Sequence, residues 1–268
     1  MYRYCTLEKT SMEQLAECFN EAFADYEQPM SFTAQSLQYY LTASAVNLSL
    51  SFGAFYDGQL VGFILNSDGI YNNQNVVFDA GTGIVPQHRG KRVFSSLFEY
   101  TCTQLKKSNI TEYYLEVLQA NHHAISVYRK KGFSVCREYA VLGATGAGDG
   151  AEGVTVTPYQ QFAAFPTDFS VKPSFEHTLH TINRNPHLYQ VASLDGSAYC
   201  IHAKRNGLIL QMHYNDLDSL KAVIAGIITR YPRAWAKNVD FSNGEVIEML
   251  TNIGFTEVTR QYEMVRKI

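Results

Sequence analysis

Four basic residues surround one glycine in the segment VPQHRGKRVFSSL, which joins a strand-like run to a helix-like run. The cluster consists of His88, Arg89, Gly90, Lys91 and Arg92. Positive charge is unfavourable at the start of a helix, because the helix dipole is positive there and the backbone N–H donors lack partners. The segment therefore predicts a bound anion at this turn, although a solvated basic loop could have the same composition.

A possible proton donor follows further along the chain, with a polar residue at helical spacing from it. Asn121 and Tyr128 lie seven residues apart, so a helix would place both on one face, about 10 Å from end to end. Asn121 is equally suited to cap that helix, and Tyr128 to pack half-buried against a sheet. A phenol with a pKa of about 10 is protonated at neutral pH, so Tyr128 carries a proton there.

Two carboxylates are candidates for the complementary general base. Glu116 ends a strand-like run twelve residues before Tyr128, and Asp79 lies on the preceding strand-like run. The alternative interpretation of Glu116 is a solvent-facing residue at a strand end. His122 and His123 stand beside these groups in the sequence, but we expect them to be exposed in the first turn of a helix.

Composition and charge restrict the class of protein. The chain has 268 residues, of which 46% are hydrophobic, so it can form one large domain or two ordinary ones. Its net charge of −3 argues against a protein that coats nucleic acid. The basic cluster is therefore local and suits a small anionic ligand.

Other sequence features point to the compartment and exclude further kinds of site. No run reaches the roughly 18 apolar residues of a membrane span, and the N-terminal segment lacks the apolar region of a signal peptide. The five cysteines are scattered and form no CxxC pair, which indicates a reducing compartment, so we expect a cytoplasmic location. His177 and His180 have no further ligand candidates nearby, and we expect no metal site.

Strand-like and helix-like segments alternate along the first half of the chain. Alternating apolar patterns and turn residues predict strands over 2–7, 48–56, 59–67, 75–85, 112–117 and 133–142. Helices are predicted over 11–23, 33–41, 93–108 and 122–131, the first with Ser11 and Gln14 as a capping box. Five glycines in residues 143–153 predict a flexible linker. The fold class is therefore α/β or α+β.

The second half of the chain repeats the first in a faint form. At an offset of 122 residues the sequence matches Val117 with Val239, Asn121 with Asn243, and Gly132-Phe133 with Gly254-Phe255. The basic cluster is not repeated, because Asp216 and Asp218 open the corresponding helix and satisfy its dipole without a ligand. We therefore expect an N-terminal domain at 1–143 with the anion site and a degenerate copy at 154–268.

Two motifs in the first half together resemble the GNAT acyltransferase family. One is QHRGKR, residues 87–92, after a strand and at the start of a helix. The other is Asn121, Ala124, Tyr128, Gly132 and Phe133 at their particular spacing. The similarity covers roughly residues 49–142. The first motif departs from the family at its last position, where Arg92 replaces the usual Gly or Ala.

The resemblance implies acetyl-CoA as cosubstrate and two GNAT-like modules, each a mixed central sheet flanked by helices. The implied cofactor-binding residues are Ile84, Val85, Arg89, Gly90, Lys91, Arg92, Val93, Phe94, Asn121 and Tyr128. The family places a general acid at the position of Tyr128, where it protonates the departing CoA thiolate. Alanine acetyltransferases of ribosomal proteins place a catalytic glutamate at the position of Glu116.

The implied reaction moves an acetyl group directly from acetyl-CoA to a primary amine. The alternative is a non-catalytic CoA-binding or partner-binding module that retained the fold. The family binds its acceptor through the loop between the first two helices, where Asp25, Tyr26 and Glu27 could hold a cationic amine. The sequence leaves the acceptor and the oligomeric state open, and neither nucleic acid nor a membrane is expected as a partner.

Overall fold

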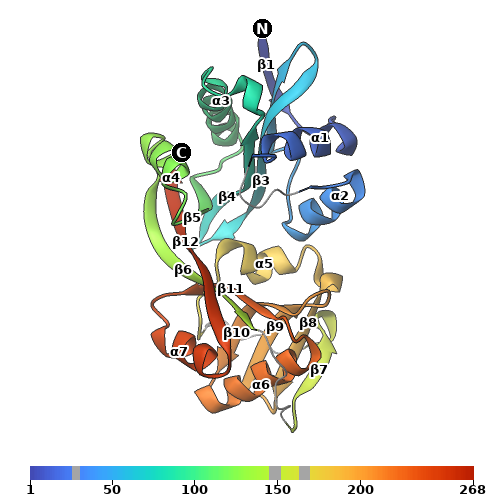
Figure 1. The fold of residues 1–268 in the computed structure, drawn as a ribbon, viewed down its shortest axis with the longest axis vertical. Coiled ribbons are helices and arrows are strands. Elements are labelled where there is room, and N and C mark those ends of the chain that lie inside the picture. Colours follow the sequence, from blue (N-terminus) through green and yellow to red (C-terminus); the bar gives the residue numbers. More distant parts are fainter. Residues whose placement is uncertain (26–30, 145–151, 163–169) are drawn as a thin grey trace. The chain divides into compact units, whose positions relative to one another are not determined.

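A computed structural model describes residues 1–25, 31–144, 152–162 and 170–268, which form two compact units (Figure 1). The first unit comprises Met1–Leu115 with Arg266–Ile268, and the second comprises Glu116–Val265. Tyr26 and Glu27 of the predicted acceptor loop, and residues 145–151 of the predicted linker, lie outside the described residues. No helix in the described ranges is both long and apolar enough to span a membrane.

The first unit contains a mixed sheet. Its strands are β1 (Tyr2–Thr6), β2 (Phe52–Tyr56), β3 (Gln59–Tyr71), β4 (Gln74–Ile84) and the start of β5 (Glu112–Leu118). Neighbouring strands from β1 to β4 pair antiparallel, and β4 pairs parallel with β5 from Val76↔Glu112 to Asp79↔Leu115. A parallel pair needs a crossover connection, and the chain between β4 and β5 supplies it as a helix.

Helices cover both faces of this sheet. They are α1 (Met12–Ala22), α2 (Ala34–Ala43) and α3 (Val93–Lys107), and Figure 1 shows α3 on the opposite side from the other two. Side chains of β3 alternate accordingly. Phe63 stacks on Phe19 of α1, whereas Asn66 accepts a hydrogen bond from Tyr113, whose ring stacks on Phe98 of α3.

The strands of the second unit are hydrogen-bonded in the order β12-β6-β11-β10-β9-β8-β7, with both parallel and antiparallel pairs. Its strands are β6 (Ser134–Ala144), β7 (Thr155–Pro158), β8 (Tyr189–Leu194), β9 (Ala198–Ala203), β10 (Leu208–Tyr214), β11 (Trp235–Asp240) and β12 (Phe255–Lys267). Its helices are α4 (His122–Lys130), α5 (Leu179–Ile182), α6 (Leu217–Arg230) and α7 (Gly244–Asn252). Only β10 and β11 pair parallel among the strand pairs described for this sheet, and α6 buries one apolar stripe against it.

The sequence repeat corresponds to a repeat of structure. Helices α4 and α7 start 122 residues apart and end 122 residues apart. In the sequence, α4 lies between β5 and β6, and α7 lies between β11 and β12. Asn121 and Asn243 are the N-cap residues of these helices. Gly132 and Gly254 follow them with φ of 87° and 94°, a left-handed conformation that explains why glycine occupies both helix ends.

The two repeats share a sheet in the second unit. β6 belongs to the first repeat, yet it pairs with both β11 and β12 of the second. The compact units therefore have different bounds from the predicted domains at 1–143 and 154–268, and that domain assignment stays a prediction. The predicted fold class is confirmed, because each unit is a mixed sheet flanked by helices.

Most predicted elements are present, with differences at their ends. The strand predicted over 48–56 starts only at Phe52, because Asn47 accepts from the backbone N–H of Ser49 and holds a turn there. The strand predicted over 59–67 is longer in the structure, where β3 continues to Tyr71. At α1, Ser11 accepts from the backbone of Gln14 as predicted, but the Gln14 side chain donates to a carbonyl outside the helix instead of completing the box.

A buried carboxylate joins β6 to β12. The Glu263 side chain is 2% exposed and accepts hydrogen bonds from Arg137 Nε at 2.8 Å and from the Tyr139 hydroxyl at 2.9 Å. The Arg137 side chain is itself 12% exposed and lies 3.6 Å from a carboxylate oxygen of Asp240. A buried ion pair of this kind is costly to break, because the remaining charge stays desolvated.

We expect Glu263→Gln to lower the free energy of unfolding by about 3 kcal/mol, because it removes the carboxylate that is hydrogen-bonded to the buried Arg137 guanidinium and leaves only the more distant Asp240. Urea unfolding of the full chain measures this loss. Glu257→Gln is the matched control: its carboxylate pairs with Arg260 on the surface, so the loss should stay within about 0.5 kcal/mol. Equal losses in the two variants would contradict the prediction.

Candidate functional site

The basic turn joins β4 to α3 through a short 3₁₀ helix, Pro86–His88. Gly90 has a φ of 71°, and Arg92 has a φ of 60° and is the N-cap residue of α3. An added Cβ at Gly90 would meet no atom within 4 Å, so the backbone conformation rather than space favours glycine there. Arg92 holds the left-handed conformation despite its Cβ, which costs roughly 1–2 kcal/mol.

The N-terminus of α3 offers backbone donors without a protein acceptor at its cap. Within the described part of the chain, no side chain makes a capping hydrogen bond to this helix, and its first turn contains no acidic residue. The corresponding helix of the second repeat, α6, satisfies itself: Asp216 accepts from the backbone N–H of Ser219 at 2.8 Å and from its hydroxyl at 2.8 Å. The predicted contrast between the two helix starts is therefore present among the described residues: α6 has a side-chain cap and an acidic first turn, and α3 has neither.

The Arg89 guanidinium is engaged within the first unit. It forms an ion pair with Asp25 and donates to the carbonyls of Ala22 and Ile84, the latter at 2.9 Å. The ion pair holds the pKa of Asp25 below its ordinary value, mainly through the hydrogen bond from Arg89. Arg89 thus ties the turn to the end of α1, while the side chains of Lys91 and Arg92 are exposed.

The other predicted cofactor-binding residues of this segment form its frame. Val85 and Val93 are buried, and Ile84 and Phe94 are half-buried. The backbone N–H of Val85 donates to a carbonyl of β3, and its own carbonyl accepts from the N–H of His88. These contacts fix the path of the backbone immediately before the left-handed positions.

The second predicted group of residues lies on α4 in the second unit. Asn121 accepts from the backbone N–H of Ala124 at 3.0 Å, so it caps this helix. Tyr128 is half-buried, and its ring meets Phe133 edge-on with centroids 5.6 Å apart. The sequence interpretations of an N-cap and of a half-buried tyrosine are both correct, and neither prevents a role in binding or proton transfer.

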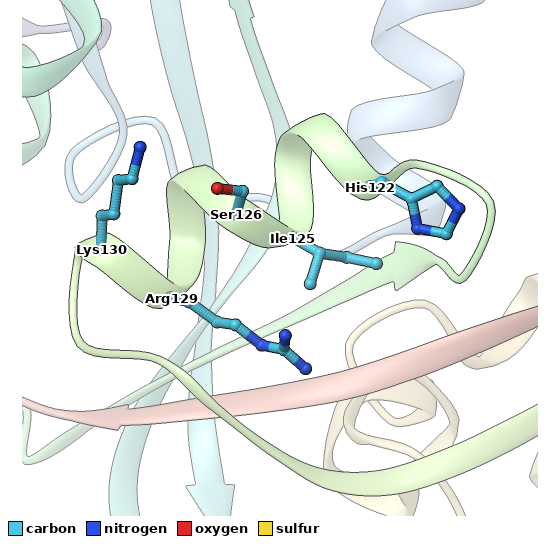
Figure 2. Close-up of a pocket in the computed structure, with 5 residues that line it drawn as sticks. All are labelled: His122, Ile125, Ser126, Arg129 and Lys130. Carbon is cyan, nitrogen blue, oxygen red and sulfur yellow. The ribbon is translucent and has the colours of Figure 1, made fainter.

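A groove of about 440 Å³ runs along another face of α4. It is lined by His122, Ile125, Ser126, Arg129 and Lys130 (Figure 2). Figure 2 shows Arg129 and Lys130 extending in different directions near the end of the helix, and no carboxylate is among these lining residues. His122 and His123 are exposed in the first turn, as predicted.

Glu116 is buried rather than solvent-facing, so the alternative of an exposed strand-end residue is wrong. Its side chain is 5% exposed. One carboxylate oxygen accepts a hydrogen bond from Asn238 Nδ2 at 2.7 Å, and the other lies 3.7 Å from Lys237 Nζ. The Lys237 ammonium also donates to Glu176 at 2.7 Å. Sequence reasoning missed these partners, although Asn238 lies 122 residues after Glu116 and the repeat could have identified it.

Burial raises the pKa of Glu116 to about 7. The Lys237 ammonium opposes this rise, while the Glu176 carboxylate adds to it. For Glu176 itself, burial alone would raise the pKa, but the charge and hydrogen bond of Lys237 outweigh burial and hold the pKa below its ordinary value. A carboxyl with a pKa near neutrality exchanges protons readily at physiological pH, as a general base must.

The remaining candidates have local roles. Asp79 accepts from the backbone N–H of Gly81 at 2.9 Å and from the Thr82 hydroxyl at 2.6 Å, so it stabilises β4 where its register with β3 shifts. His177 is buried, and burial lowers its pKa to about 3. No group of three or more His, Cys, Asp or Glu residues in the described ranges is arranged to hold a metal ion.

Comparisons with known proteins give a family match for the first repeat and a likeness of fold for the whole chain. Residues 11–133 match the model of the acetyltransferase (GNAT) family. No curated protein matches the chain. Among solved structures, a proposed acetyltransferase from Pyrococcus horikoshii has a TM-score of 0.72 at 13% identity and covers 100% of this chain and 89% of its own. A tandem GNAT protein from the clavulanic acid biosynthesis pathway has a TM-score of 0.65 at 12% identity, with 100% and 98% covered.

A third solved structure extends the fold likeness. The GCN5-related N-acetyltransferase from Sphaerobacter thermophilus has a TM-score of 0.64 at 14% identity, with 99% of this chain and 95% of its own covered. At such identities the likeness concerns the fold alone. It spans both repeats, whereas the family match spans only the first.

We expect the stability that Glu116 contributes to decrease as the pH rises between the ordinary Glu pKa of 4.5 and about 7. The reason is that Glu116 has the higher pKa in the folded state, so the folded state binds more protons across this range. Glu116→Gln keeps an acceptor for Asn238 but cannot titrate, so its stability relative to the wild type should be greater above pH 7 than below pH 4.5.

Urea unfolding across this pH range measures the effect. Glu248→Gln, an exposed position on α7, is the control and should leave the pH dependence of the wild type unchanged. Parallel curves for Glu116→Gln and the wild type would contradict the raised pKa.

Proposed function

We propose that the chain transfers an acetyl group from acetyl-CoA directly to a primary amine, because residues 11–133 match the model of the acetyltransferase (GNAT) family. The single observation that carries this proposal is the start of α3, which lacks a side-chain cap among the described residues and is flanked by the exposed cations Lys91 and Arg92. The family performs acyl transfer, and this helix start is suited to the anionic part of an acyl-CoA donor.

The diphosphate of CoA is the anion that fits the basic turn. Gly90 and Arg92 both have a left-handed backbone conformation, and turns that contain such residues can present successive backbone N–H groups to phosphate oxygens. Lys91 and Arg92 would add charge-assisted hydrogen bonds. Arg89 contributes by fixing the turn through Asp25, which is a more indirect role than the direct phosphate contact that the motif suggested.

The proposed chemistry assigns one proton transfer to each of two side chains. Glu116 takes a proton from the acceptor ammonium, and the resulting amine attacks the thioester carbonyl. The tetrahedral intermediate expels the CoA thiolate, which Tyr128 protonates. The second proton of the nitrogen then passes to the Tyr128 phenolate and restores the phenol, and Glu116 releases the first proton to solvent. The products are the acetylated amine, CoA and one released proton.

An acceptor screen tests the proposal. Full-length protein is incubated with acetyl-CoA and a panel of polyamines, amino acids, aminoglycosides and peptide N-termini, and released thiol is detected. Thiol release that requires both protein and amine would support the transferase. CoA binding without thiol release for any amine would favour the alternative, a non-catalytic CoA-binding module.

We expect Lys91→Ala and Arg92→Asn to weaken CoA binding far more than binding of pantetheine, which lacks the phosphates. Each charge-assisted contact is worth about 1.5–3 kcal/mol, roughly 10-fold or more in affinity. Asn is chosen at position 92 because it tolerates the left-handed conformation.

Calorimetry with each ligand measures the two affinities. Lys106→Ala, at the opposite end of α3, is the matched control and should change neither. Equal losses for CoA and pantetheine would show that the cluster is only a solvated basic surface.

We expect Tyr128→Phe to lower turnover about 10²-fold while CoA affinity stays within a factor of about two, since general acid catalysis contributes 10²–10⁴-fold and a thiolate leaves readily. The phenylalanine ring keeps the contact with Phe133, so the fold should persist. Steady-state kinetics with the best acceptor checks this. Tyr231→Phe removes a phenol from the second repeat and should leave turnover unchanged; wild-type turnover in Tyr128→Phe would show that this phenol is structural.

A further inference from the structure

An irregularity in β11 brings two neighbouring side chains to the same carboxylate. In a regular strand, successive side chains point to opposite faces. The register between β11 and β6 shifts between Ala236 and Val239, and Asn238 has a φ of 59°, so β11 contains a bulge at this point. As a result Lys237 and Asn238 both reach Glu116, the first at one carboxylate oxygen and the second at the other.

A further layer of residues supports this arrangement. Asn238 Nδ2 also donates to the Ser174 hydroxyl at 3.1 Å, which fixes the plane of the amide. Glu176, two residues further along, accepts from the Lys237 ammonium at 2.7 Å. The ammonium therefore lies between the carboxylates of Glu116 and Glu176, and it is the cation that balances both.

The repeat explains why an amide occupies position 238. Asn238 lies 122 residues after Glu116, so the two are equivalent positions of the two repeats, and they are hydrogen-bonded to each other. A glutamate retained at position 238 would face Glu116 with a second carboxylate, and two such groups cannot both be charged at this distance. The amide instead donates to Glu116 and leaves one ionisable carboxyl in the pair.

We infer that Lys237 and Asn238 of the second repeat are positioning residues for Glu116, holding its carboxylate and setting the pH at which it takes a proton. The inference rests on the proposed function in one respect, the role of Glu116 as general base. It makes the second repeat part of the catalytic apparatus, although that repeat has no anion site of its own at α6.

Other titratable groups lie around Glu116 and bear on its pKa. Glu263 on β12 raises the pKa of Glu116 through its negative charge, but it is paired with Arg137 on β6. Tyr139, also on β6, donates to Glu263 and is neutral at physiological pH, because burial raises the pKa of its phenol far above the ordinary value. His177 is neutral as well, since burial lowers its pKa to about 3. Lys237 and Glu176 therefore remain as the charges whose removal has opposite effects on Glu116.

The test follows the Glu116 carboxyl directly. The full chain is labelled with [5-¹³C]glutamate, the Glu116 signal is assigned by its loss in Glu116→Gln, and its pKa is measured by NMR titration. Lys237→Met should raise this pKa by about one to three, because an adjacent cation lowers a carboxyl pKa by that amount. Glu176→Gln should lower it, because the carboxylate that raises it is removed and the ammonium is left to Glu116 alone. Asn238→Asp, which tolerates the left-handed backbone, should raise it.

Two controls distinguish the effect of the positive charge at position 237 from the effect of removing a lysine elsewhere. Lys237→Arg keeps the cation and should restore a pKa close to that of the wild type. Lys221→Met makes the same change as Lys237→Met at an exposed position on α6 and should have no effect. If Lys237→Met does not fold, the downward shift in Glu176→Gln and the upward shift in Asn238→Asp decide the outcome.

Unchanged titration of Glu116 in Glu176→Gln and Asn238→Asp would overturn the inference, whether or not the protein acetylates any amine. With an acceptor from the screen, kcat/KM is measured as a function of pH. The acidic limb of this pH profile should move in the same direction as the NMR pKa in each variant, while the KM for acetyl-CoA stays constant. Shifted NMR values with an unmoved limb would leave the positioning of Glu116 standing and overturn its proposed role as the base.

Discussion

The burial of one carboxylate constrains much of the second compact unit. Glu116 is almost inaccessible to solvent, and a charged carboxylate in such a place needs a cation and hydrogen-bond donors nearby. β11 provides both from adjacent positions, which a regular strand could not do. The bulge, the left-handed Asn238 and the approach of Glu176 to Lys237 are all consequences of meeting that requirement.

The same requirement gives a physical account of how the repeats diverged. One repeat keeps a helix start without a side-chain cap in the described structure, beside exposed cations, whereas the other closes its helix with Asp216. One repeat keeps a carboxylate at its strand end, whereas the other has an amide that donates to it. The second copy therefore lacks both features, and its Lys237 and Asn238 instead contact the Glu116 carboxylate of the first copy. The strand order also connects the two repeats, because β6 of the first repeat lies between β11 and β12 of the second.

Local patterns predicted a large part of the fold, because short-range physical chemistry fixes them. The 122-residue repeat predicted a second copy, in which α7 corresponds to α4. Both helices are followed by a glycine in the left-handed conformation, which glycine adopts without steric cost. Acidic residues at the start of α6 predicted a self-capped helix. Errors occurred where a side chain competes with the strand, as when Asn47 holds a turn before β2. The basic cluster was identified, but the ion pair of Arg89 with Asp25 joins residues 64 apart and has no local signal.

The sequence by itself determined the residue types and the order of elements: a glycine-containing basic turn before a helix, a tyrosine seven residues after an N-cap asparagine, and a degenerate second copy. Only the tertiary structure decided the state of Glu116. Its burial, its raised pKa and its partners depend on a strand more than a hundred residues away, and on a bulge that turns two neighbouring side chains the same way. Desolvation and charge act through space. The pKa of a carboxyl therefore depends on the side chains that surround it in the folded structure and not on its neighbours in the sequence.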